Sequence, residues 1–371
     1  MQRRRFKVAA VSAVAALGLV LGACSKASDS TSTTSAAAPG TTDAATSAPA
    51  SAESSAPAGS ESSAPASSAA GDGLAPSSMS DDPKPLVAIV SKGFQHQFWQ
   101  AVKSGAESEA EKLGVEITFE GPPSESDVEV QIDMLTQAIG KKPAALGFAA
   151  LDSKAAAPLL EQAKSEDIPV IAFDSGVESD IPLTTASTDN KAAAAEAAKH
   201  MSELIGGEGK VALVVHDQTS QSGTQRRDGF MEWMAANAPN VELLEPQYGG
   251  GDQAESADIT KAIIAANPDI KGIFGSNEGS AIGVVKGVEE SGATGITVVG
   301  FDSGKAQIDA IKSGVMAGAI TQNPVGIGEK TVQAAVAAIQ GETLPEVIDT
   351  GFYWYDKENI DDPTITAVLY E

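Results

Sequence analysis

The sequence predicts an α/β protein with two similar doubly wound lobes of parallel β-sheet. The chain has 371 residues, which is too long for one ordinary domain and suits two domains plus an export segment and a tether. From Leu86 onward, short apolar runs alternate with longer amphipathic stretches. A strand-end motif also occurs twice, which indicates that one structural unit is repeated.

The apolar runs have the length and composition of strands that are buried on both faces. They are Leu86–Val90, Ile117–Phe119, Ala144–Ala149, Pro169–Phe173, Lys210–Val215, Val241–Leu244, Gly272–Gly275, Ile296–Phe301 and Ala319–Thr321. Apolar residues recur at helical spacing between them, as in Val128, Ile132, Leu135 and Ile139. Strands that alternate with helices over this length favour parallel sheets.

The repeated motif is an apolar run that ends in Phe-Asp-Ser-Gly. It occupies Ile168–Gly176 and again Ile296–Gly304. In open α/β sheets, ligands bind beyond the carboxyl ends of the strands. We therefore expect Asp174 and Asp302 to lie at equivalent places in two lobes that face each other.

The N-terminal segment is typical of an exported protein. Basic residues at positions 3–7 precede an apolar stretch, Val8–Val20, that is too short to span a bilayer. Small residues then lead to Cys24, which resembles a bacterial lipobox. The resemblance implies a signal peptide over residues 1–23 and a lipid on Cys24; the alternative is a plain signal peptide with an incidental cysteine.

Residues 24–83 are composed mainly of Ser, Ala, Thr, Pro and Gly. So few large apolar residues cannot form a core, and we predict a disordered tether. The formal net charge of −25 argues against nucleic-acid binding and against adsorption to anionic lipid, because such an acidic surface has too few basic groups to neutralise phosphates. We expect a monomer that meets the membrane only through its lipid anchor, and Cys24, the single cysteine, excludes an intramolecular disulfide.

Signatures of enzymes are absent from the sequence. There is no Gly-x-Ser-x-Gly motif or phosphate-binding P-loop, and the three histidines lack metal-ligand spacing. Asp174 and Asp302 could perform acid–base chemistry, but no nucleophile accompanies them. We predict neither an enzyme nor a bound cofactor or metal.

Recognition of hydroxyl groups is the better use of the polar residues at the predicted strand ends. A sugar needs carboxylates, amides that both donate and accept, a guanidinium, and aromatic rings against its C–H faces. These types follow the predicted strands as Phe98, Trp99, Asp174, Arg226, Asn277, Asp302 and Gln322.

From about Lys84 to the C-terminus, the chain resembles the periplasmic (type I) sugar-binding proteins of ABC importers, of the ribose/galactose-binding kind. The stretches that carry the resemblance are Val87–Ser91 with Phe98-Trp99, Ile168–Asp174, Ser187–Asn190, Arg226–Phe230, Ile273–Glu278, Val298–Asp302 and Ile320–Asn323. It implies two lobes joined by a three-strand hinge. The N-terminal lobe would be residues 84–187 plus 323–350, and the C-terminal lobe 188–322 plus 351–371.

The resemblance also implies roles for individual residues. Aromatic cover would come from Phe98 and Trp99, and hydroxyl acceptors from Asp174 and Asp302. Arg226 would donate to the ring oxygen and hydroxyls, Asn277 and Gln322 would bridge, and Ser91 and His96 would form a weaker polar pair. Two positions depart from the ribose-type pattern: Ser175 stands where those proteins have Arg, and Tyr248 is the one aromatic available before three glycines. We therefore expect ribose to bind less tightly than the true ligand.

The predicted function is capture of a small sugar or polyol and delivery to the permease subunits of an ABC-type importer. A sensory module that presents the sugar to a membrane receptor would use the same fold. A sugar-responsive repressor would need a basic DNA-binding segment before the first strand, where this chain has an acidic tether.

Replacement of the predicted lipid-bearing residue tests the anchor. We expect Cys24→Ala to release soluble protein into the medium or periplasm, because the thiol that would carry the lipid is gone. Fractionation and immunoblotting give the measurement. A variant that stays in the membrane fraction would show that the lipobox interpretation is wrong.

Overall fold

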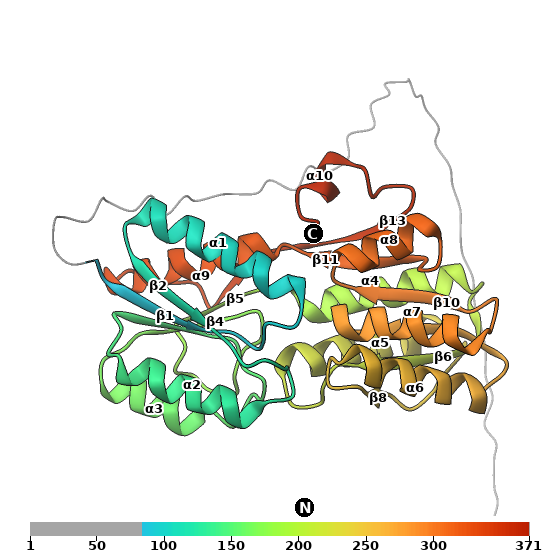
Figure 1. Cartoon of the computed structure of the whole chain (residues 1–371), viewed down its shortest axis with the longest axis horizontal. Coiled ribbons are helices and arrows are strands. Elements are labelled where there is room, and N and C mark those ends of the chain that lie inside the picture. The colour runs from blue at the N-terminus through green and yellow to red at the C-terminus, as the bar shows by residue number, and fades with distance from the viewer. Residues whose placement is uncertain (1–83, 371) are drawn as a thin grey trace, which may run out of the picture. The chain divides into compact units, whose positions relative to one another are not determined.

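Two β-sheets, each flanked by helices, form the part of the chain that the computed structural model describes, residues 84–370 (Figure 1). The predicted signal peptide, Cys24 and the tether lie outside the described residues. Each sheet with its helices is a lobe, and we call them the N-lobe and the C-lobe. This arrangement confirms the predicted fold class.

The N-lobe is built on a six-stranded sheet in which all pairs are parallel, in the order β12-β5-β4-β3-β1-β2. Its strands are β1 (Leu86–Val90), β2 (Glu116–Glu120), β3 (Ala145–Phe148), β4 (Val170–Phe173), β5 (Thr184–Ser187) and β12 (Val347–Asp349). Its helices are α1 (Gln97–Leu113), α2 (Val128–Gly140), α3 (Ala157–Ser165) and α9 (Pro324–Ile339). Helices α1 and α9 pack on one face of the sheet, and α2 and α3 cover the other (Figure 1).

The C-lobe is built on a seven-stranded sheet in the order β13-β11-β10-β9-β6-β7, with β8 paired to β6. Its strands are β6 (Glu208–Val215), β7 (Asn240–Leu243), β8 (Gln247–Tyr248), β9 (Ile270–Gly275), β10 (Thr297–Phe301), β11 (Gly318–Gln322) and β13 (Phe352–Asp356). Its helices are α4 (Asn190–Leu204), α5 (Gln221–Asn237), α6 (Gln253–Ala266), α7 (Glu278–Ser291), α8 (Lys305–Ser313) and α10 (Pro363–Thr366). The edge strand β13 runs antiparallel to β11, so this sheet is mixed rather than purely parallel.

The chain passes between the two lobes at three places. It leaves the first sheet after β5, returns between β11 and α9, and leaves again between β12 and β13. Helix α9 packs along α1, although more than two hundred residues separate them in the sequence, because the chain comes back to complete the N-lobe. Neither lobe is therefore a continuous segment.

Apolar side chains fill the space between each sheet and its helices. In the N-lobe, Val87 and Ile89 of β1 pack toward α1 and α9, while Val90 points to the opposite core beside Leu135. This alternation follows from the two-residue period of a strand and explains why both faces of the apolar runs are buried. Burial of this apolar surface is the main favourable term that holds the lobes together.

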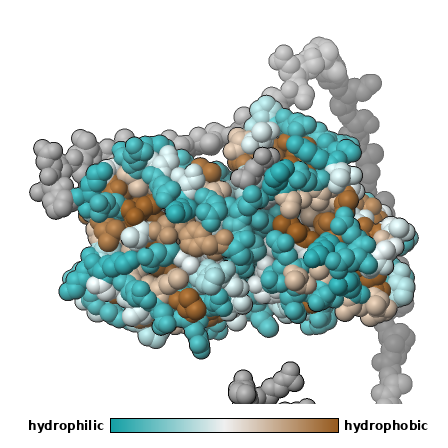
Figure 2. Space-filling view, viewed as in Figure 1, coloured by the Kyte–Doolittle hydropathy of each residue, from teal (hydrophilic) through white to brown (hydrophobic). Residues whose placement is uncertain are grey.

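The face of the molecule in Figure 2 is largely hydrophilic, with apolar residues in separate patches over both lobes. Among the described residues, the large apolar side chains that are most exposed include Val347 and Leu183. No helix between residues 84 and 370 has the length and hydropathy that crossing a bilayer requires.

Candidate functional site

The two copies of the repeated motif have the same backbone geometry. Asp174 follows β4 with φ of 55°, and Asp302 follows β10 with φ of 82°. Side chains other than glycine seldom adopt this left-handed region, although aspartate tolerates it better than most. Each backbone N–H donates to the next strand: Asp174 to Ala186 O at 2.9 Å, and Asp302 to Ile320 O at 2.6 Å.

The left-handed turn at these positions places a carboxylate at the carboxyl end of each sheet. Both side chains are buried, with exposed fractions of 5% for Asp174 and 3% for Asp302. The Asp302 carboxylate accepts from Gln322 Nε2 at 2.6 Å and from the backbone N–H of Glu278 at 2.9 Å. Burial raises the pKa of both groups, and for Asp174 it does so to about 6.

Arg226 of helix α5 lies next to the second of these carboxylates. Its Nε donates to Asn190 Oδ1 at 2.8 Å, and its Nη1 donates to the backbone carbonyl of Ser276 at 2.9 Å. The guanidinium carbon lies 3.8 Å from the centre of the Phe301 ring, and Nη1 lies 4.0 Å from Asp302 Oδ2. These contacts fix the plane of the guanidinium before any ligand arrives, which limits the entropy that binding would cost.

Two aromatic rings from the first turn of α1 form an apolar wall. Phe98 and Trp99 are buried and meet edge to face, with ring centres 5.0 Å apart. Trp99 Nε1 donates to Glu125 Oε1 at 2.7 Å, so the indole is held at both its apolar and its polar side. The Glu125 carboxylate in turn accepts from Asn277 Nδ2 of the C-lobe at 3.2 Å.

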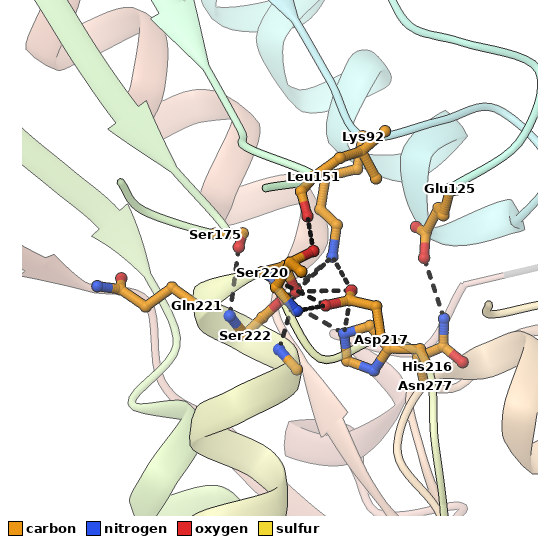
Figure 3. A network of polar contacts seen from close by, with 12 residues as sticks. Lys92, Glu125, Leu151, Ser175, His216, Asp217, Ser220, Gln221, Ser222 and Asn277 are labelled. Carbon is orange, nitrogen blue, oxygen red and sulfur yellow. Dashed lines mark hydrogen bonds and ion pairs between the residues drawn. The ribbon is translucent and has the colours of Figure 1, made fainter. Parts of the chain in front are cut away.

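A buried lysine adds a polar network between the lobes that the sequence analysis did not predict (Figure 3). Lys92 Nζ, just after β1, donates to Ser220 Oγ and Ser222 Oγ at 3.2 Å each and lies 3.5 Å from Asp217 Oδ2. Ser220 is also the N-cap of α5, so Lys92 donates a hydrogen bond to the residue that caps a C-lobe helix.

The charges of this network influence one another strongly. Burial opposes ionisation of Asp217, but the Lys92 ammonium and hydrogen bonds from Ser220 outweigh it and hold the pKa of that carboxyl below its usual range. Burial would likewise raise the pKa of Glu125, but Lys92 lowers it overall. Burial and the same ammonium lower the pKa of His216 to about 3, so this ring is neutral at pH 7.

These side chains enclose one small cavity between the lobes. The cavity has a volume of about 20 Å³. This is room for roughly one water molecule and far less than a pyranose needs. Its lining residues are Lys92, His96, Phe98, Trp99, Glu125, Asp174, His216, Ser222, Arg226, Asn277, Asp302 and Gln322. Most of the residues predicted from the sequence therefore come together here.

Three predicted residues, Ser91, Ser175 and Tyr248, do not line the cavity. Ser91 Oγ lies within hydrogen-bond distance of two backbone carbonyls that its single O–H can donate to, those of Gly93 at 3.3 Å and Glu120 at 3.2 Å. Ser175 Oγ accepts from the backbone N–H of Ser222 at 3.2 Å, which joins the lobes. Tyr248 OH accepts from Arg227 Nη1 at 3.3 Å, and its ring packs in the C-lobe core.

Several polar atoms in this cavity have no hydrogen-bond partner among the described residues. Both ring nitrogens of His96 are buried without a hydrogen bond, although Nε2 lies 3.9 Å from Glu125 Oε2. Oε1 of Gln322 is also buried without a hydrogen bond. An unsatisfied buried polar atom costs about 1–3 kcal/mol, so these positions favour a ligand that can donate and accept. Among residues 84–370, no cluster of His, Cys, Asp or Glu has the arrangement of a metal site.

A larger groove of about 590 Å³ lies near the crossing segments, lined by residues that include Leu183, Asp189, Gln225 and Val347. It has no aromatic or basic side chain on its walls, and several of its lining residues, such as Leu183 and Val347, are exposed. We place the candidate site in the smaller cavity because donors, acceptors and aromatic rings converge there.

Comparisons with known proteins agree with this geometry. A family model described as a periplasmic binding protein domain matches residues 87–343. The D-allose-binding periplasmic protein of Escherichia coli is 29% identical over 70% of this chain and 86% of its own length. Two solved ABC transporter solute-binding proteins from Agrobacterium vitis are similar over their whole length. One, bound to α-D-tagatopyranose, is 32% identical over 78% of this chain with a TM-score of 0.75; the other, with D-fucose, is 33% identical over 77% with a TM-score of 0.74.

The raised pKa of Asp174 predicts how stability depends on pH. In the closed form, the folded pKa of about 6 exceeds the ordinary value of 3.8, so the contribution of Asp174 to the free energy of unfolding should fall by about 2–3 kcal/mol as pH rises from ~4 to above 6. Asp174→Asn should remove this loss. We expect the variant to be more stable than the wild type at pH 7 and equal to it near pH 4, as measured by urea unfolding.

The exposed Asp361, whose side chain is 90% accessible, provides the matched control. Asp361→Asn should change stability by less than ~0.5 kcal/mol at either pH. Equal destabilisation of Asp174→Asn at both pH values would show that Asp174 is not held as a costly buried anion.

Proposed function

The chain belongs to the periplasmic binding protein domain family, and from this premise we propose that it is an extracytoplasmic lipoprotein that captures a small sugar or polyol between its lobes and delivers it to an ABC-type importer. Members of this family bind sugars for transport and are not enzymes. The relatives named above include proteins that bind D-allose, α-D-tagatopyranose and D-fucose.

The observation that carries this proposal is the convergence of sugar-binding groups in one enclosed cavity. Asp174 and Asp302 offer charged acceptors, Arg226 offers a fixed donor, and Phe98 and Trp99 offer an apolar wall. Hydroxyl groups donate and accept at the same oxygen, so a polyol can satisfy carboxylates and the unpartnered nitrogens of His96 together. Charge-assisted bonds of this kind are about twice as strong as neutral ones.

The charges in the cavity favour a neutral ligand. Glu125, Asp174 and Asp302 line it against two cations, Lys92 and Arg226. A sugar acid or sugar phosphate would bring a further buried negative charge without a free cation to pair with it, which is costly in a site of low dielectric.

Entry of the sugar requires the lobes to separate, because the cavity is too small to hold a sugar and its lining side chains are buried. We propose that the three crossing segments act as the hinge, with the lobes bounded as the sequence predicts: residues 84–187 plus 323–350, and 188–322 plus 351–371. Hinge closure around a ligand is a common switching motion. The closed form would then dock on the importer's permease subunits.

A ligand panel tests both binding and closure. D-allose, D-ribose, D-fucose, D-arabinose and D-tagatose should be screened singly against residues 84–371 by thermal shift, with glucuronate as an acidic comparison. A sugar at a thousandfold excess over its Kd adds ~4 kcal/mol to stability, and the radius of gyration from solution scattering should fall. We expect ribose to rank below the best sugar and glucuronate to give no shift. An unaltered radius at saturation would contradict hinge closure.

Removal of the second strand-end carboxylate tests the site. Asp302→Ala should leave sugar hydroxyls and Gln322 without their acceptor and cost ~2–4 kcal/mol of binding free energy. This corresponds to a Kd about 30- to 1,000-fold weaker by calorimetry. Trp99→Ala should also weaken binding, through lost apolar cover. Wild-type affinity in a folded Asp302→Ala protein would place the ligand elsewhere.

A further inference from the structure

Helices α1 and α8 begin at the space between the two lobes, which we call the cleft. Neither has a side-chain cap from its own lobe. The first turn of any helix has backbone N–H groups that need acceptors. At the start of α1, the N-cap residue His96 makes no side-chain cap, and at the start of α8 the N-cap is Gly304, which has no side chain. The other cleft helices of the C-lobe are capped locally, α5 by Ser220 and α7 by Asn277.

The missing acceptors come from the opposite lobe. The carboxylate of Glu278, at the start of α7 in the C-lobe, accepts from the backbone N–H groups of Gln97 and Phe98 in the N-lobe, at 3.1 Å each. In return, Oε1 of Gln97 accepts from the backbone N–H of Lys305 at the start of α8, at 2.8 Å. Each of the two lobes thus caps a helix of the other.

Gly304 provides the space for this exchange. A Cβ at this position would lie 2.8 Å from Cδ of Glu278, closer than Cβ atoms come to other atoms, and 3.1 Å from Oε1 of Gln97, which is a tight contact. The φ of Gly304 is −62°, which any residue can adopt, so a larger residue here would act by displacing the ends of the Glu278 and Gln97 side chains and not by straining the backbone. The side chains of Glu278 and Gln97 therefore occupy the space beside Gly304 that a Cβ would need.

The exchange is connected to the sugar-lining residues on both sides. The backbone N–H of Glu278 donates to Asp302 Oδ2 at 2.9 Å. Tyr370 OH lies 3.5 Å from the Glu278 carboxylate. On the other side, the first turn of α1 carries Phe98 and Trp99, with His96 just before it. Glu278 is 4% exposed, so its charge is stabilised mainly by the groups it touches.

We propose that Glu278 and Gln97 are reciprocal helix caps that form only when the lobes close, and that Glu278 is thereby the positioning residue that holds His96, Phe98 and Trp99 around the sugar. The inference rests on the proposed function, because it assigns to sugar binding a residue that does not line the cavity. It predicts that the caps stabilise the closed form and leave the open form untouched.

The test compares Glu278→Ala, Glu278→Gln and Gly304→Ala with the wild type. D-allose, D-fucose and D-tagatose are each titrated by calorimetry, and sugar release is followed through the intrinsic tryptophan fluorescence by stopped flow. Loss of a charged cap should weaken the Kd ~10- to 100-fold in Glu278→Ala, mostly as faster release, and less in Glu278→Gln, which keeps one acceptor. Gly304→Ala should reproduce the effect although it changes neither capping residue. The melting temperature without sugar should stay at the wild-type value.

Asp252→Ala is the matched control, because this exposed residue caps α6 within its own lobe through the N–H of Glu255. We expect it to lower the melting temperature with and without sugar and to leave the Kd unchanged. Wild-type Kd and release rates in both Glu278→Ala and Gly304→Ala would overturn the inference, as would equal losses of stability with and without sugar. If the wild type binds none of the sugars, the proposed function fails and the inference fails with it.

Discussion

A charged side chain can be buried between two lobes only if hydrogen-bond or ion-pair partners surround it there. The arrangement of the whole cleft depends on this constraint. Burial of an unpaired charge costs several kcal/mol, whereas a paired and hydrogen-bonded one can be accommodated. Lys92 follows a strand of the N-lobe sheet, and its acceptors, Ser220, Ser222 and Asp217, belong to the C-lobe. Glu125 similarly accepts from Asn277 across the cleft. The polar network is therefore complete only when the lobes are together.

The strand-end turns supply the groups that this constraint acts on. A parallel sheet directs its loops and helix N-termini to one edge, and the positive φ at Asp174 and Asp302 turns each carboxylate into the space between the lobes. The backbone N–H of each aspartate is fixed to the neighbouring strand, so the unusual conformation is supported by the sheet itself. Burial then raises the pKa of both groups, because it disfavours the charged carboxylate. Hydrogen bonds from donors offset this cost.

Much of the fold could be predicted from the sequence, because strands buried on both faces appear as continuous apolar runs. The predicted strand at Leu86–Val90 has the bounds of β1. The missed strands lack that signal: β5 is Thr-Thr-Ala-Ser, β8 has only the two residues Gln247 and Tyr248, and β12 and β13 are edge strands with exposed positions such as Val347 and Tyr353. An edge strand needs no second apolar face, so its pattern resembles a loop.

The site divides in the same way. Asp174 and Asp302 could be predicted because a repeated motif marks the end of a buried strand, and the cavity includes both. Lys92 and Glu125 could not, since a lone lysine or glutamate in a loop usually faces solvent, and their burial depends on contacts with the other lobe. The signal available for Lys92 was its position directly after Ser91, at the end of the first strand. Glu278 gave even less indication, because its partners are backbone groups of a distant helix.

Contacts that form only on closure have a consequence for affinity. Bonds such as those of Glu278 and Lys92 stabilise the closed lobes whether or not a sugar is present, so on the proposed function they bring the closed form nearer in free energy to the open one. A ligand can shift such an equilibrium only by its own preference for the closed state. That preference must come from groups that the protein alone leaves unsatisfied, and the ring nitrogens of His96 and Oε1 of Gln322 are such groups in the cavity. The protein–protein bonds thus set how readily the lobes close, while the unpartnered atoms set which solute keeps them closed.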